Sequence, residues 1–75
     1  MDLNDYSKED LWELIVEAVH ASVMYPTHKA YTRDTVLVET PNITHGELAR
    51  RLSIPVGEAL VLLKELADDK QKTVP

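Results

Sequence analysis

The side chains best suited to bind a metal ion are three histidines, His20, His28 and His45. No two of them are three or four residues apart, which is the spacing that places two ligands on one face of a helix. The chain contains no cysteine, which excludes disulfide bonds and thiolate metal sites. The sequence therefore predicts no metal site.

The patterns that accompany catalysis are missing as well. The sequence has no nucleophile elbow, no glycine-rich loop to cradle a phosphate and no adjacent carboxylate pair in an apolar surround. A chain of 75 residues builds one small core and leaves little room for a cofactor-sized cleft. We expect neither enzymatic activity nor a cofactor.

Three basic side chains are placed to contact phosphate, namely Arg50, Arg51 and Lys64. The charge around them is balanced, because residues 25–75 hold seven acidic and seven basic side chains. The net charge of −5 comes from residues 1–24, where six acids stand against one lysine. The half that carries the three bases therefore lacks the strong positive charge typical of a nucleic-acid-binding domain.

These side chains are positioned by two predicted helices. Thr44 and Glu47 have the spacing of a capping box, which predicts a helix over residues 44–53. Pro55 suits the first turn of a second helix, predicted over residues 55–68 after a turn of about three residues. The apolar positions of both helices recur at the 3.6-residue period and predict a shared core. Its largest members are Leu48, Leu52, Leu63 and Leu66.

The stretch ITHGELARRLSIPVGEALVLLKEL, which begins at Ile43, resembles the central unit of the helix-turn-helix superfamily, in particular its winged-helix branch. The residues that match the branch pattern are Glu47, Leu48, Ala49, Leu52, Ile54, Ala59, Leu63 and Leu66. Ser53 stands where the family frequently has a turn glycine. The resemblance implies a mainly α, three-helix domain with a minor β element, and the superfamily hosts many functions.

The first helix is predicted over residues 8–25, after a loose lead-in of residues 1–6. Ser7 and Asp10 repeat the capping arrangement, and a proline ends the pattern. Apolar side chains sweep roughly 220° of this helix, about twice what a surface helix needs. The excess predicts burial on two sides within the domain or a homodimer formed through this helix. Trp12 is either a core anchor or an interface hot spot.

The remaining segments complete a single domain, residues 1–75. Residues 25–33 lack a helical period and are expected to form a loop. The β-branched run that follows predicts a short strand over residues 35–39. Residues 70–75 are expected to be a tail or a short strand, which leaves the wing truncated or absent unless the natural protein continues beyond Pro75.

The outward face of the helix over residues 55–68 bears on the choice between DNA and protein as the partner. Base edges are read by Arg, Lys, Asn, Gln, Ser or Thr, and on a helical wheel only Lys64 qualifies there. The apolar residues predict a protein-contact surface instead. It consists of Val56, Gly57, Leu60 and Val61, with Val61 pointing outward, together with Trp12 of the first helix.

The sequence thus favours a non-enzymatic regulatory or adaptor module that contacts a protein partner or a second copy of itself. The alternative is a DNA-binding transcriptional regulator in which Arg50, Arg51 and Lys64 contact phosphate. No apolar run approaches the ~20 residues that span a bilayer, and no signal-peptide pattern is present. We therefore expect a cytoplasmic protein without membrane contact.

Overall fold

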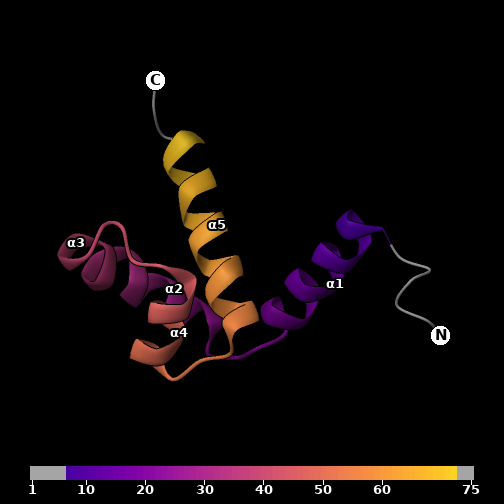
Figure 1. Ribbon diagram of the computed structural model, residues 1–75, viewed down its shortest axis with the longest axis horizontal. Helices are drawn as coiled ribbons and strands as arrows, with labels where there is room; N and C mark the ends of the chain where they lie inside the picture. The colour runs from indigo at the N-terminus through magenta and orange to yellow at the C-terminus, as the bar shows by residue number, and fades with distance from the viewer. Residues whose placement is uncertain (1–6, 73–75) are drawn as a thin grey trace.

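The computed structural model describes residues 7–72, and the side chains of residues 7–70. This part of the chain is all-helical and contains no strand. Its elements are α1 (Lys8–His20), α2 (Tyr25–Tyr31), the π-helical turn η2 (Thr32–Val36), α3 (Leu37–Glu39), α4 (His45–Leu52) and α5 (Val56–Lys72). α5 stands in the middle, with α1 on one side and α2, α3 and α4 on the other (Figure 1).

The helix predicted over residues 8–25 is too long, because α1 covers residues 8–20, residues 21–24 form a turn and residue 25 is the first of α2. α1 begins with a capping box, in which Ser7 Oγ accepts from the Asp10 N–H at 3.0 Å and Asp10 Oδ2 accepts from the Ser7 N–H at 3.3 Å. α1 ends at His20, and α2 begins at Tyr25 with a proline in its first turn. Proline is compatible with that position because the N–H it lacks would be unpaired there. The expected lead-in, residues 1–6, lies outside the described residues.

The loop predicted over residues 25–33 and the strand predicted over residues 35–39 are both wrong, because α2, η2 and α3 form a nearly continuous helical segment. Thr32 Oγ1 donates to the His28 carbonyl at 2.7 Å, which satisfies this buried hydroxyl within the helix. Val36 is fully buried. β-branched residues have only a weak preference for strands, and burial in a helical core overrides it here.

α4 and α5 are joined by a short turn. Thr44 Oγ1 accepts from the Glu47 N–H at 3.2 Å and caps α4. Ser53 ends α4 in the left-handed region, at φ 56° and ψ 45°, a conformation that glycine adopts more readily. α5 then continues through Lys72, so residues 70–72 are helical rather than a strand, and residues 73–75 of the expected tail lie outside the described residues.

The core surrounds α5. Its buried apolar cluster consists of Val19, Tyr25, Val36, Leu48, Ala49, Ala59, Val61 and Leu62. Of the four leucines predicted to share the core, Leu48 and Leu66 are buried, whereas Leu52 and Leu63 are half-buried. Within residues 7–72, every helix is too short or too polar to span a bilayer.

Candidate protein-contact surface

α5 is covered on more sides than its helical wheel indicates. Val61 is 0% exposed and Leu60 is half-buried, so the prediction that Val61 points outward is wrong. The reason is that α1, α2 and α4 all pack against α5, and every residue from 57 to 63 is buried or half-buried. Val56, one residue before this covered stretch, remains 51% exposed.

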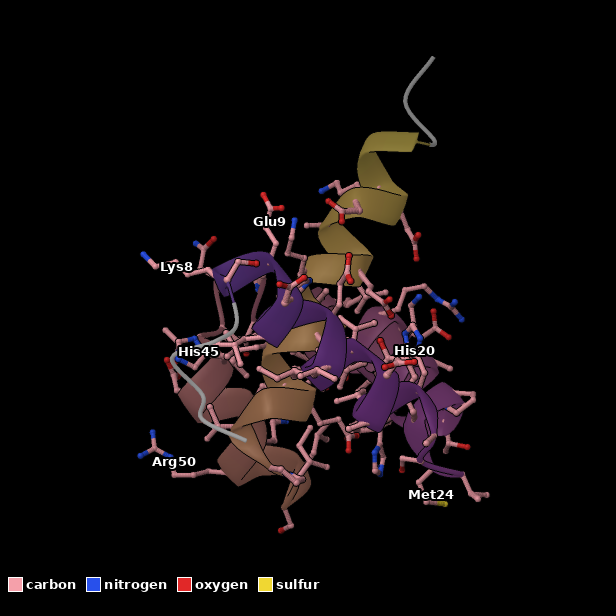
Figure 2. The ribbon with its side chains drawn as sticks, turned by 90° about the vertical axis from the view of Figure 1, so that its right-hand side faces the viewer. Lys8, Glu9, His20, Met24, His45 and Arg50 are labelled. Atoms are coloured by element: carbon pink, nitrogen blue, oxygen red, sulfur yellow. The ribbon has the colours of Figure 1, made fainter. Side chains whose placement is uncertain are left out.

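Exposed aliphatic side chains lie on α1 and at the beginning of α5, and Figure 2 shows α1 passing in front of α5. On α1, Leu14 and Ile15 are exposed and Ala18 continues their row one turn later. A Cβ atom added to Gly57 of α5 would lie 3.7 Å from Ile15 Cγ2, so the two helices touch at this point. We name this surface the α1–α5 apolar face, and it consists of Leu14, Ile15, Ala18, Pro55, Val56 and Gly57.

The α1–α5 apolar face contains a shallow groove with a volume of about 490 Å³. Its lining combines side chains of α1 with the turn before α5, and its only charged member, Glu58, is itself engaged with His28. The residues that line it are Ile15, Ala18, Val19, Ser22, Pro55, Gly57 and Glu58. Of the predicted protein-contact residues, Gly57 lines this groove, and Val56, which does not line it, is the exposed residue that precedes Gly57 in the chain.

A second groove, with a volume of about 520 Å³, separates the other side of α1 from the C-terminal half of α5. Trp12 lines this groove and also packs against the core. Its side chain therefore contributes to the core and reaches a surface groove. The rest of the lining is largely acidic and consists of Glu13, Val16, Glu17, Lys64, Glu65 and Asp68.

Of the three bases predicted to contact nucleic acid, Arg50 and Arg51 lie on α4 and Lys64 lies on α5. Arg50 projects from α4 into solvent (Figure 2). Arg51, also on α4, donates from Nη2 to Glu39 Oε2 at 3.0 Å. Lys64 belongs to the acidic groove beside α1, where its Nζ lies 3.6 Å from Asp68 Oδ2. The structure does not bring these three side chains together into one basic surface.

A set of polar contacts that the sequence reasoning missed fastens α1 and α2 to α5. The Tyr25 hydroxyl donates to Glu65 Oε1, and His20 Nε2 lies 2.9 Å from Glu65 Oε2. Lys29 Nζ lies 3.7 Å from Glu65 Oε1 and 3.1 Å from Asp69 Oδ2. We call these five residues the polar clamp. The four-residue spacing of Tyr25 and Lys29 would have indicated it only if residues 25–31 had been recognised as a helix.

The electrostatics of the polar clamp suit it to holding helices together. Burial raises the pKa of the Tyr25 phenol far above its ordinary value, and the hydrogen bond to Glu65 raises this pKa further. Burial also acts to raise the pKa of Glu65, but the hydrogen bonds with Tyr25 and His20 outweigh it and lower that pKa. A neutral phenol and an ionised carboxylate near neutral pH make a stable donor and acceptor pair, and neither is poised to exchange a proton.

A second polar contact, between His28 and Glu58, also joins α2 to α5. His28 Nδ1 lies 2.5 Å from Glu58 Oε2, and Glu58 is only 7% exposed. His45 is exposed on α4, far from His20 in Figure 2. In the described part of the chain, no group of three or more acidic or histidine side chains is arranged to hold a metal ion. Each buried side-chain nitrogen or oxygen there has a hydrogen-bond partner.

The arrangement thus presents surfaces for contact, an uncharged one at the α1–α5 apolar face and an acidic one on the other side of α1. Comparisons of the chain with protein-family models, with curated proteins and with solved structures found no match.

Proposed function

We propose that this protein is a non-enzymatic regulatory or adaptor module that acts by protein contact through the α1–α5 apolar face. The observation that carries the proposal is that α1 and α5 touch at Ile15 and Gly57, and that Ile15 and the chain neighbours of these two residues, Leu14 and Val56, are exposed. Single exposed apolar residues are ordinary, whereas a contiguous group from two elements is typical of an interaction surface.

We further propose that α4 and α5 form a helix-turn-helix unit. The Thr44 cap, the left-handed Ser53 and the burial of Leu48 and Ala49 support this assignment. In such a unit α5 would occupy the place of the recognition helix. Because α1, α2 and α4 cover much of α5, its residues are used for packing, which favours protein contact over base reading. Residues 7–72 contain no strand. We therefore propose a helix-turn-helix unit that has no wing within these residues.

The second candidate is a DNA-binding regulator, and the exposed edge of α4 favours it. Arg50 and His45 project from this edge into solvent (Figure 2). Bases at such an edge would contact phosphate, so that binding would be weak, steeply dependent on salt and indifferent to sequence. Lys64 lies among carboxylates, which argues against a phosphate contact by Lys64 together with the side chains of α4.

A selection from a displayed library of random helical peptides tests the protein-contact proposal. Peptides enriched on the wild-type chain should lose binding to Val56→Glu, because a carboxylate in the middle of an apolar interface loses its water. Val56 begins α5, where an acidic side chain interacts favourably with the helix dipole, so the variant should fold. The matched control is Val38→Glu, because Val38 is 73% exposed on α3, on the other side of α5 (Figure 1).

Enriched peptides that bind Val56→Glu as tightly as the wild type would contradict the proposal. Titration with random-sequence duplex DNA at low salt tests the second candidate in parallel. If duplex binding is lost in the Arg50→Ala/Arg51→Ala double variant and retained in Val56→Glu, and no peptide is enriched, the DNA-binding function is favoured.

A further inference from the structure

We infer that the partner on the α1–α5 apolar face is an amphipathic helix that carries lysine or arginine side chains along one edge. The inference rests on the proposed function and names the chemistry of its partner. It comes from the distribution of charge on α1. Exposed carboxylates of α1 lie along one edge of the α1–α5 apolar face.

That edge is a row of three acidic residues. Asp10, Glu13 and Glu17 follow one another at helical spacing and are all exposed. On the helical wheel this row adjoins the one that contains Leu14 and Ala18. Within residues 7–70, Glu13 and Glu17 have no ion-pair partner. We call Asp10, Glu13 and Glu17 the acidic row.

Negative charge continues from the acidic row across the neighbouring groove. Glu65 and Asp68 of α5 line its far side, and Lys64 is the single cation in the lining. Trp12 lies on the same wall as Glu13, where a lysine or arginine of the partner could also interact with the indole ring. A helix that places its apolar side chains on Leu14 and Ile15 would bring an adjacent basic edge against the acidic row, whereas the carboxylates of α5 lie across the groove on the other side of α1.

The same charge placement disfavours a second copy of the chain as the occupant. Two α1 helices that pair antiparallel about a two-fold axis bring identical edges together, so Asp10 of one copy would approach Glu17 of the other. Each copy also carries a net charge of −5. Like charges at an interface rim oppose association and suppress that pairing. A basic partner gains attraction from the charges that repel a second copy.

The experiment compares two synthetic peptides of about 18 residues, or about five helical turns. One has leucine on its apolar face and lysine elsewhere, and the other has glutamate in place of each lysine. The emission of Trp12, the only tryptophan of the chain, reports binding, and calorimetry confirms it. We expect the full chain to bind the lysine peptide at least tenfold more tightly than the glutamate peptide, with a preference that shrinks as salt is added.

Variants assign this preference to the acidic row. The Glu13→Gln/Glu17→Gln double variant should bind the lysine peptide about twofold to thirtyfold more weakly, which is the range for two solvent-exposed ion pairs. The control is Glu39→Gln/Glu47→Gln, which makes the same change in net charge on α3 and α4. Glutamine at position 47 can still accept from the Thr44 hydroxyl that contacts Glu47 at 2.9 Å. This control should retain the wild-type preference.

The possible failures are distinguishable. If both peptides bind equally and Val56→Glu abolishes both, the protein-contact function stands and the basic partner is wrong. If neither peptide binds the wild type, or if the Glu13→Gln/Glu17→Gln variant retains the full preference, the inference is overturned. It is also overturned if the chain forms a dimer in solution that Val56→Glu dissociates, because a second copy then occupies the face.

Discussion

Glu65 of α5 is contacted by three side chains from two other helices, α1 and α2. Its carboxylate accepts from Tyr25, contacts His20 and lies near Lys29, so one side chain of α5 contacts the last residue of α1 and two residues of α2. A partly buried carboxylate with several donors is stable as an anion. The His20 contact joins the C-terminal end of α1 to α5, the helix with which α1 forms the α1–α5 apolar face.

The acid stability of the domain should therefore depend on Glu65. Its pKa in the folded chain lies below the ordinary 4.5, so on acidification the unfolded chain takes up the proton first. The stabilisation from this group is fully present above pH 4.5 and is lost as the pH falls through the lowered pKa. Urea unfolding at a series of acidic pH values should show this loss in the wild type and a shallower one in Glu65→Gln.

Tyr25→Phe provides an intermediate case, because it removes one hydrogen bond to Glu65 and keeps the ring in the core. Its acid sensitivity should lie between those of the wild type and Glu65→Gln, and near neutral pH its free energy of unfolding should fall by about 0.5–1.5 kcal/mol. Identical pH dependence in all three proteins would show that Glu65 is not held as described.

At this scale the sequence identifies contacts between residues close in the chain and misses those between distant ones. The Ser7 and Thr44 caps can be predicted from the sequence because each hydroxyl accepts a hydrogen bond from the residue three positions later. The contacts of Glu65 join residues 40 and 45 positions apart. No spacing rule links such pairs until the elements that carry them are placed in space.

Among the elements, the segment from α2 to α3 determines which side chains of α5 are buried. A proline and a β-branched run led to the prediction of a loop and a strand, but the segment is helical and packs beside α5. Because α2 packs against α5 in addition to α1 and α4, fewer side chains of α5 are exposed to solvent than the helical wheel predicts. This is why Val61 is in the core, whereas Val56, at the first position of α5, remains exposed.

Two valine-to-glutamate substitutions on α5 should therefore have very different effects on stability, one large and one small. Val61→Glu buries a carboxylate without a partner, which costs several kcal/mol, and a domain of this size has only a few to lose. We expect it to be unfolded by circular dichroism at room temperature. Val56→Glu should melt close to the wild type, within about 1 kcal/mol. A folded Val61→Glu protein would show that this side of α5 faces solvent after all.

On the scale of the whole molecule, α1 carries exposed apolar side chains and exposed carboxylates on neighbouring edges. Its outer side carries the α1–α5 apolar face along one edge and the acidic row along the next. The bases of α4 lie elsewhere, and Arg51 is engaged with Glu39. The broad apolar arc of this helix was predictable from the sequence, but its partial burial against α5 could be seen only with both helices in place.

The mass in solution follows from this distribution of charge. We expect light scattering at tens of micromolar to give the 8.5 kDa of a single chain at low salt, because the acidic rows of two copies repel each other. The homodimer expected from the apolar arc alone would instead scatter at twice that mass. A dimer that persists in dilute salt would mean that apolar burial on α1 outweighs the repulsion.

The central claim is that the α1–α5 apolar face is where this protein meets its partner. Backbone amide chemical-shift mapping by NMR, with a peptide selected on the wild-type chain, tests it most directly. We predict that the largest shifts fall on Leu14, Ile15 and Ala18 of α1 and on Val56 and Gly57 of α5, and that the exposed edge of α4 changes little. Shifts concentrated on His45, Arg50 and Arg51 of α4, with α1 unaffected, would contradict the claim.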